Sequence, residues 1–289
     1  MVCSAHRTAV RIAADAAEVI DAANAVYIAV PPLFHRVYVE ACVAAETAIF
    51  CEKPLGIDVA ESRELVHLVA SSGLPAGVNF VFGAAPSATR LQSATIADEQ
   101  GTTAIGEIVR GELRLHFAEW PRAWHAKAQW LRLRDQGGWI REVVSHFLFL
   151  ALRTLGPIRL ETSTVTFPNG PHSELCEVDA TARFRAGDHP LVMIGTSGGL
   201  GPDVVDFTVR GTAGSLRIWD WYRLQTADGD GWSDALGSDR ATLAADAYSA
   251  QLDALSSMLD DEPTTIATFV EALAVQEVVE AILSSPDDS

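Results

Sequence analysis

The chain has 289 residues, of which 48% are hydrophobic and 20% charged, a balance typical of a globular protein long enough for two compact domains. Its formal net charge is -17, from 21 Lys and Arg against 38 Asp and Glu. Nucleic acids and anionic membranes need a basic footprint, so this surplus of negative charge argues against both as partners.

The cysteines and the amino end favour a cytoplasmic location. Cys3, Cys42, Cys51 and Cys176 form no C-x-x-C pair, so we interpret them as reduced thiols rather than as disulfide partners or zinc ligands. No apolar run reaches the roughly 18 residues of a membrane helix, and the amino end lacks the apolar core of a signal peptide. We therefore expect a soluble protein in a reducing compartment.

The first hundred residues alternate predicted strands and helices. In chain order we expect a strand at 25–30, a helix at 33–46, a strand at 47–51, a helix at 61–72, a strand at 76–82 and a helix at 87–96. Asp58 and Glu61 form a capping pattern that marks the start of the second helix. This alternation with short connections predicts a parallel sheet with right-handed crossovers.

After Gly106 the pattern changes to an α+β one. We expect a long strand at 107–120, a helix at 137–156, strands from about 158 to 226, and two closing helices at about 241–260 and 264–284. In 176–184 apolar and polar residues alternate, which predicts an antiparallel strand with Glu177 and Asp179 on a wet face. Residues 204–221 predict a hairpin that turns between Gly211 and Gly214.

The predicted architecture is therefore α/β plus α+β. Residues 1–104 form a partial doubly wound parallel domain, and residues 105–289 form a domain with an open, mainly antiparallel sheet. The last helix is free to pack back on the first domain.

The segment Glu52-Lys53-Pro54 follows a buried strand directly. One interpretation is that Pro54 stops the strand and the two charges lie in water. The other starts from the fact that α/β proteins bind ligands at the carboxyl ends of parallel strands. A lysine there, beside low-dielectric walls, is suited to proton chemistry. His35, just after Pro31-Pro32 at the end of another strand, is a second candidate at the same edge.

Glu142 and His146 are four residues apart on a predicted helix, so their side chains project from one face. Three interpretations remain open from the spacing. The pair forms a hydrogen bond without catalytic meaning, or it is half of a metal site, or Glu142 orients His146 as a general base. No second motif among the other histidines supports the metal interpretation, and we expect no metal.

Four of the seven tryptophans precede that helix, namely Trp120, Trp124, Trp130 and Trp139. Core packing explains any one of them. A dense run in a polar, irregular segment is equally typical of a ligand pocket whose flat rings meet a sugar or a similar substrate.

Together these motifs resemble the Gfo/Idh/MocA oxidoreductase family. They are Pro31-Pro32-x-x-His35, Glu52-Lys53-Pro54, Gly106-Glu107-Ile108, Trp130 before Gly137-Gly138, Glu142-x-x-x-His146 and the hairpin Gly211-Thr212-Ala213-Gly214-Ser215-Leu216. The resemblance implies a Rossmann domain followed by an open-sheet domain that binds substrate and often mediates oligomers. It also implies hydride transfer between NAD or NADP and a carbinol carbon of a sugar, inositol or similar polyol.

The resemblance also assigns roles. Lys53 would hold and polarise the reacting oxygen, His146 would exchange the proton, and Glu142 would stand where the family usually has aspartate. The residues expected at the cofactor are Val30, Pro31, Pro32, His35, Glu52, Lys53, Pro54 and Trp130, and those expected at the substrate are Asn79, Trp124 and Trp139.

Several positions depart from the family pattern. Glu142 replaces aspartate, Phe149 occupies a position where many members carry another aspartate, and Asn79 is the polar residue left where an arginine is common. These departures predict a subfamily with its own substrate.

The largest departure is that the sequence contains no G-x-G-x-x-G. Residues 9–32 correspond to the third and fourth strands of the usual fold, and the turn that cradles the pyrophosphate would precede Met1. We therefore expect weak NAD(P)H binding by these 289 residues, and restored binding on adding an upstream extension of roughly 50 to 70 residues. The alternatives are a cofactor-deficient binding or assembly subunit and an NAD-dependent, glycoside-cleaving variant.

Self-association is the last expectation. The strands between about 158 and 226, with Trp219 and Trp221, offer more apolar surface than the neighbouring helices can cover. Exposed patches of that kind usually mark interfaces, so we expect a homo-oligomer through the large sheet.

Overall fold

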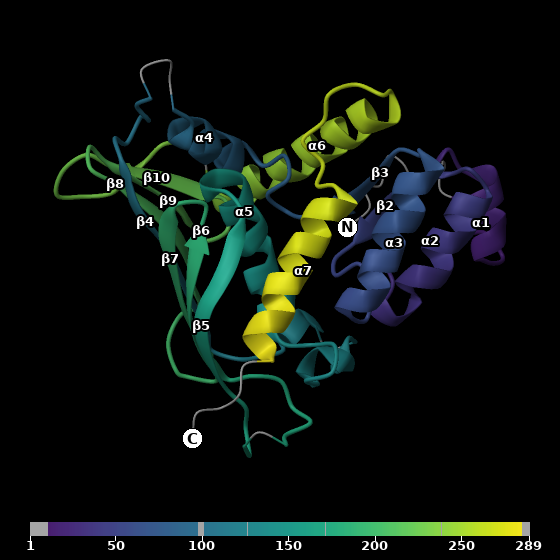
Figure 1. Cartoon of the computed structure of the whole chain (residues 1–289), viewed down its shortest axis with the longest axis horizontal. Coiled ribbons are helices and arrows are strands. Elements are labelled where there is room, and N and C mark those ends of the chain that lie inside the picture. Colours follow the sequence, from purple (N-terminus) through teal and green to yellow (C-terminus); the bar gives the residue numbers. More distant parts are fainter. Residues whose placement is uncertain (1–10, 98–100, 126, 171, 238, 285–289) are drawn as a thin grey trace.

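Two sheets lie on either side of helix α7 (Phe269–Leu283), as Figure 1 shows. The computed structural model describes residues 11–97, 101–125, 127–170, 172–237 and 239–284. Helix α7 packs against α3 (Val59–Ser72) on the small-sheet side and against β5 (Ile158–Thr166) and α5 (Ser145–Leu155) on the large-sheet side. The closing helix therefore joins the two halves.

The small sheet is parallel, with the order β1-β2-β3. Its elements are α1 (Ala16–Ala22), β1 (Ala25–Ile28), η2 (Pro32–Phe34), α2 (His35–Ala44), β2 (Ala48–Glu52), α3 (Val59–Ser72), β3 (Ala76–Asn79) and α4 (Pro86–Thr95). The predicted alternation of strands and helices and the predicted parallel sheet are confirmed. The third-strand segment expected from residue 9 falls partly outside the described residues, and 11–13 are irregular.

Local sequence explains where α3 begins and ends. The Asp58 side chain accepts a hydrogen bond of 2.8 Å from the Glu61 amide, and the Glu61 side chain accepts one of 2.7 Å from the Ile57 amide. These bonds satisfy amides that the helix itself leaves free. Gly73 ends the helix with a φ of 68°, a left-handed conformation that glycine adopts without steric cost.

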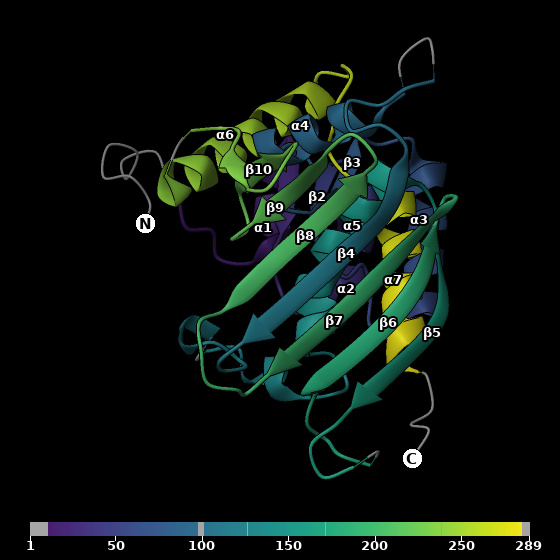
Figure 2. The ribbon, with the colours of Figure 1, turned by 90° about the vertical axis from the view of Figure 1, so that its left-hand side faces the viewer.

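The large sheet has the strand order β11-β10-β9-β8-β4-β7-β6-β5 (Figure 2). Only β4 and β7 pair in parallel, and the other neighbours are antiparallel, as the sequence predicted for most of this sheet. The strands are β4 (Ile108–Phe117), β5 (Ile158–Thr166), β6 (Asp179–Ala186), β7 (His189–Ser197), β8 (Val204–Gly211), β9 (Ser215–Trp219), β10 (Arg223–Ala227) and β11 (Ser233–Asp234).

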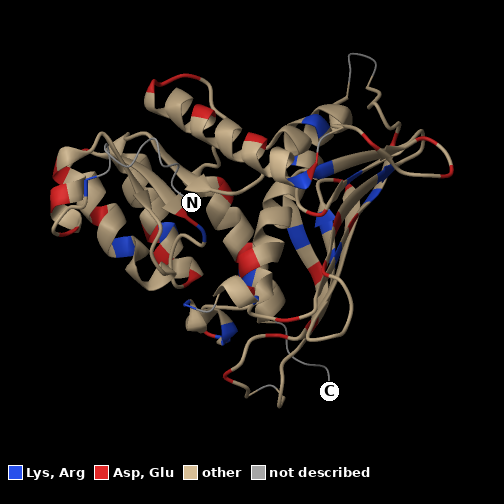
Figure 3. Cartoon of the chain, turned by 180° about the vertical axis from the view of Figure 1, so that it is seen from behind, with Lys and Arg blue, Asp and Glu red and all other residues tan. Residues whose placement is uncertain are grey.

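One face of the large sheet is covered by helices and the other carries charged side chains. Helix α5 (Ser145–Leu155) is almost wholly buried against the covered face. On the other face Asp206 is buried between Arg114, at 3.0 Å, and Arg217, at 3.4 Å. Figure 3 shows basic and acidic segments along these strands.

The ion pairs of Arg114, Asp206 and Arg217 form a charged lattice on the outer face of the large sheet. The sequence had instead suggested an excess of exposed apolar surface on these strands. Trp221, expected in that excess, packs inward with its ring 5.7 Å from that of Phe147. Trp219 lies under the guanidinium of Arg217, which is 5.0 Å from the ring centre. The apolar rings of this hairpin are therefore already covered within the chain.

Two local predictions need correction. The helix expected over 137–156 begins at Ile140 with a π-helical turn, η5 (Ile140–Val144), before α5 continues it. Glu177, expected on a wet strand face, lies in the loop before β6 and is fully buried. The alternation that placed it there holds only from Asp179 onward, where the strand begins.

Two closing helices complete the chain as predicted. Helix α6 (Arg240–Leu259) and helix α7 lie within a few residues of the expected ranges. Thr268 and Glu271 form a capping box that sets the start of α7. Throughout the described part of the chain, no helix combines the length and the apolar character needed to cross a membrane.

Candidate active site

The carboxyl ends of β1, β2 and β3 meet at one edge of the small sheet, because the strands are parallel. The segments that follow these ends include Val30, Glu52 to Pro54, and Asn79. His35 links the first two: its Nδ1 lies 2.8 Å from the Pro54 carbonyl oxygen and its Nε2 lies 2.8 Å from that of Val30. The residue is 0% exposed, so this buried ring connects the loop after β1 to the loop after β2.

Asn79 is held in a hydrogen-bond network on one side of this edge. Its Nδ2 donates to the Tyr27 hydroxyl at 3.0 Å and to the Glu52 carboxylate at 2.8 Å, and its Oδ1 accepts from Gln251 at 3.2 Å. The Tyr27 hydroxyl also donates to Glu52. Burial, and next the charge of Glu52, raise the pKa of Tyr27, so its hydroxyl keeps its proton. Both ends of the Asn79 amide are thus engaged within the chain.

Lys53 leaves the strand end on the opposite side from Glu52, since successive strand residues point to opposite faces. It is 8% exposed, and its Nζ lies 2.9 Å from the Glu142 carboxylate. Nζ also donates to the backbone oxygens of Glu142 at 3.3 Å and Arg141 at 3.4 Å. Three acceptors therefore surround the three N–H groups of a buried cation, and the two long contacts are weak enough to exchange for a ligand oxygen.

The turn that supplies these acceptors is η5, the π-helical start of α5. Single π-helical turns occur often at functional sites. The sequence left open whether Glu142 orients His146, and the structure gives no hydrogen bond between them among the contacts described. Glu142 pairs with Lys53 instead, because the lysine projects from β2 directly onto this turn.

His146 lies in the same cluster, on the first turn of α5. Its ring packs edge-on to Phe80, with centroids 5.6 Å apart, and near Trp221, at 6.3 Å. Nδ1 is buried and has no hydrogen-bond partner in the part of the chain that the structure describes. Burial, and then the nearby charge of Lys53, hold the pKa of His146 well below its usual range. The imidazole is therefore neutral at physiological pH and able to accept a proton.

His125, in the short helix η3 (Ala123–His125), is a neighbour that sequence reasoning missed. Burial lowers its pKa, while the charge of Glu142 raises it and those of Arg122 and Lys53 lower it further. The charges of Lys53 and Glu142 therefore act on His125. Its position in the Trp-rich segment after β4 was the one signal available in the sequence.

The three tryptophans assigned to ligands have different surroundings. Trp139 is 0% exposed, and its indole nitrogen donates to the Glu177 carbonyl at 3.1 Å. It packs so closely on Gly195 that a Cβ added there would lie 2.5 Å from the ring, so Trp139 belongs to the core. Trp124 is 71% exposed beside His125, and Trp130 is half-buried in η4 (Gln129–Arg132).

Helix α7 fixes the two sides of the site relative to each other. Arg141 of η5 forms a two-pronged ion pair with Glu280, at 2.7 Å and 2.8 Å. On the other side Gln276 accepts from the Ser62 hydroxyl at 2.8 Å and donates to the Gly56 carbonyl at 3.1 Å. The Lys53 loop and the start of α5 are therefore held through one rigid element. Within the described ranges no three His, Cys, Asp or Glu side chains gather as metal ligands.

Residues 2–80 match the model of the Gfo/Idh/MocA family, which is described as an oxidoreductase family with an NAD-binding Rossmann fold. Residues 2–80 are therefore similar to the NAD-binding domain of this oxidoreductase family. The resemblance inferred from Pro31-Pro32, His35 and Glu52-Lys53-Pro54 is thereby confirmed.

Solved structures extend the likeness of this chain to both sheets. A levoglucosan dehydrogenase in complex with NADH and L-sorbose has a TM-score of 0.75 at 19% identity, over 94% of this chain and 80% of that one. An Agrobacterium radiobacter oxidoreductase in complex with NAD+, L-tartaric acid and magnesium gives 0.74 at 19%, over 94% and 80%. An NAD binding oxidoreductase from Klebsiella pneumoniae gives 0.73 at 20%, over 94% and 80%. These likenesses show the two-domain fold, and no curated protein matches the sequence.

The residues present fit one end of the family's cofactor. Val30, Pro31, Glu52 and Pro54 are at least partly exposed along the sheet edge, with His35 buried beneath them. Beside this edge His146 has an Nδ1 without a hydrogen-bond partner among the described residues, and the charge of Lys53 acts on its ring. The chemistry of this set suits a nicotinamide ring and its reacting partner. The sequence has no counterpart of the glycine turn that would cradle the pyrophosphate.

Proposed function

We propose that this chain is an NAD(P)-dependent oxidoreductase that transfers a hydride to or from a carbinol carbon of a sugar, inositol or similar polyol. The observation that carries the proposal is the cluster of Lys53, Glu142 and His146 at the carboxyl edge of an NAD-binding-family sheet. Oxidation of an alcohol releases a hydride and a proton, so a cationic donor and a neutral base must meet the same oxygen. Lys53 and His146 supply these two groups.

In this mechanism Lys53 donates a hydrogen bond to the reacting oxygen. The oxygen replaces one of the two long backbone contacts of Nζ, while the 2.9 Å pair with Glu142 keeps the ammonium in place. His146 accepts the hydroxyl proton in the oxidation direction, because its lowered pKa keeps it unprotonated before the reaction. Glu142 positions Lys53.

The cofactor supplies hydride acceptance or donation when it is bound. The proposed lining is the exposed strand edge at Val30, Pro31, Glu52 and Pro54, together with Trp130, while the buried Pro32 and His35 support it from beneath. Trp124 and Asn79 remain proposed substrate contacts, and the core position of Trp139 limits it to a supporting role.

Turnover of a polyol panel by the wild type and by Lys53→Met tests the proposal. Lys53 is one of two lysines, and the other, Lys127, is exposed, so Lys127→Met is a matched control. We expect Lys53→Met to lower turnover at least ~100-fold and Lys127→Met to leave it unchanged. Equal turnover by both variants would remove Lys53 from the reaction.

We also propose a cytoplasmic homo-oligomer. Cys42, Cys51 and Cys176 are free, buried thiols, which suits a reducing compartment. Self-association would use the outer face of the large sheet through its charged lattice. Light scattering that gives a monomer at micromolar concentration would contradict it.

A further inference from the structure

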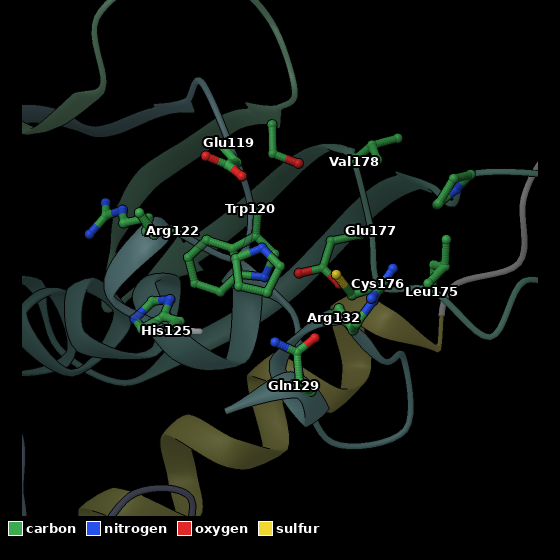
Figure 4. Close-up of a pocket in the computed structure, with 14 residues that line it drawn as sticks. Glu119, Trp120, Arg122, His125, Gln129, Arg132, Leu175, Cys176, Glu177 and Val178 are labelled. Carbon is green, nitrogen blue, oxygen red and sulfur yellow. The ribbon is translucent and has the colours of Figure 1, made fainter. Parts of the chain in front are cut away.

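A cavity of about 570 Å³ lies just past the carboxyl end of β4 and beside the end of β7 (Figure 4). It is formed by the chain that follows β4, by η4 and by the loop before β6. This volume lies within the range of sites for small organic ligands. Its lining combines the indole of Trp120 with polar side chains, among them Arg122, His125 and Glu177.

Glu177 is the unusual member of this lining. It is 1% exposed, and its Oε1 accepts a hydrogen bond of 2.7 Å from the Ile140 amide. Its Oε2 is equally buried and has no partner among the described residues. A buried polar oxygen without a hydrogen bond costs roughly 1–3 kcal/mol. A hydrogen bond from a bound group to Oε2 of Glu177 would remove this cost.

The backbone makes room for this carboxyl group. Gly138 has a φ of 97°, and a Cβ added there would stand 2.3 Å from Oε2 of Glu177. Only glycine fits this conformation and this spacing together. The close approach keeps the carboxyl against the α5 start, and Figure 4 shows its side chain extending toward Trp120 with Gln129 nearby.

Other charged groups do not neutralise the free oxygen. Arg141 of η5 and Glu280 of α7 are paired with each other, and Cys176 keeps its proton because burial raises the pKa of its thiol to about 12. Arg122 lies over the Phe117 ring at 4.5 Å and 3.4 Å from Asp203. Burial raises the pKa of Glu177 to about 7, against the opposing effects of the Ile140 amide and Arg141.

We propose that this cavity binds the part of a polyol substrate remote from the reacting carbon, with a ligand hydroxyl on Oε2 of Glu177 and the ligand's C–H face on Trp120. The inference rests on the proposed function, because it extends the Lys53 site toward the large sheet. A hydroxyl both donates and accepts, so it satisfies the carboxyl in either protonation state. An anionic ligand would be repelled by ionised Glu177, and a cationic one would face Arg122 and Arg132.

His125 belongs to the cavity and is also influenced by the charges of the Lys53 site. Its ring lines the cavity and contacts Trp120 edge-on at 5.5 Å, while the charges of Glu142 and Lys53 act on its pKa.

Calorimetric titration with D-glucose, D-sorbitol, myo-inositol and maltose, each in excess NADH, tests the inference. We expect Glu177→Leu to weaken the best ligand at least ~10-fold, and Glu177→Gln to stay within ~3-fold because the amide also donates and accepts. Glu174→Leu is the matched control, since it makes the same change on an exposed carboxylate of the same loop that does not line the cavity, and it should leave the affinity unchanged.

A second variant keeps the test decisive if Glu177→Leu does not fold. Ser197→Phe fills the cavity from a partly exposed strand end and should weaken the same ligand at least ~10-fold. No binding of any of the four polyols, or equal affinities for the wild type, Ser197→Phe and any folded Glu177→Leu, would overturn the inference. Failure of the proposed function would appear as equal turnover by the wild type and Lys53→Met, whereas failure of this inference would appear in the polyol affinities of the cavity variants.

Discussion

Glu142 and Glu177 flank the same helix start, yet the chain treats their charges in opposite ways. Glu142 keeps some exposure and pairs with Lys53 at 2.9 Å, so this cluster is balanced within the chain. Glu177 is fully buried, and one of its oxygens has no partner in the described structure. The difference separates a region assembled for proton and hydride chemistry from one left to be completed by a ligand hydroxyl or a proton.

The largest effect on kcat should come from changes in the cluster of Lys53, Glu142 and His146. His146→Ala removes the base and should lower kcat at least ~100-fold with little change in polyol affinity. His172, exposed in the loop before β6, gives the control His172→Ala, which should leave kcat unchanged. Steady-state kinetics on the best polyol measures both, and a normal kcat for His146→Ala would exclude it as the base.

The uncompensated carboxyl should be visible in stability. The pKa of Glu177 is raised from its usual 4.5 to about 7, so its contribution to stability is complete below pH 4.5 and is lost as the pH rises through about 7. Glu177→Gln should therefore be more stable than the wild type above pH 7, by up to about 3 kcal/mol, and similar near pH 5.

Thermal unfolding of the two proteins between pH 5 and pH 8.5 measures this difference. Glu119→Gln is the control here. Because Glu119 is exposed, the free energy of unfolding of this variant should change with pH in parallel with that of the wild type. A constant offset between Glu177→Gln and the wild type across this range would mean that Glu177 is ionised throughout.

Much of the architecture was readable from the sequence because it depends on local patterns. The strand and helix alternation, the Asp58 cap and the hairpin at Gly211 follow from periodicity and turn chemistry that act over a few residues. Lys53 and His146 were predicted as site residues from motifs. Their proximity needs long-range packing, in which α7 holds the β2 end against η5.

The sequence misled where long-range contacts override the pattern. The alternation 176–184 placed Glu177 on a wet face, yet the strand starts at Asp179 and the preceding loop folds over the α5 start. The four-residue spacing suggested a contact between Glu142 and His146. In the fold, Lys53, which follows β2 of the small sheet, forms the ion pair with Glu142. His125 carried no motif, since only the fold brings it near Lys53.

A smaller effect is expected from Glu142→Gln. The amide keeps the volume and a hydrogen bond to Lys53 and loses only the charge that steadies the ammonium. We expect kcat to fall less than ~10-fold, well short of the His146→Ala loss. A loss as large as that of His146→Ala would assign Glu142 a direct part in proton transfer.

The smallest effect is on a titration. Lys53 is one of the two causes that lower the pKa of His146, and burial is the larger. Lys53→Met should therefore raise the pKa of His146 without bringing it to the usual histidine value. NMR titration of the histidine ring signals, assigned with His146→Ala, measures this shift. An unchanged pKa of His146 would show that the charge of Lys53 does not act on it.

Hydride transfer followed with an isotope tests the central claim most directly. Each polyol would carry deuterium on its carbinol carbons and be incubated with the protein and NAD or NADP at about 1 mM, the upper end of usual KM values. The account predicts deuterium on the nicotinamide ring with the wild type and at least ~100-fold less with Lys53→Met. A folded wild type that transfers no deuterium from any polyol to either cofactor would contradict it, as would equal transfer by Lys53→Met.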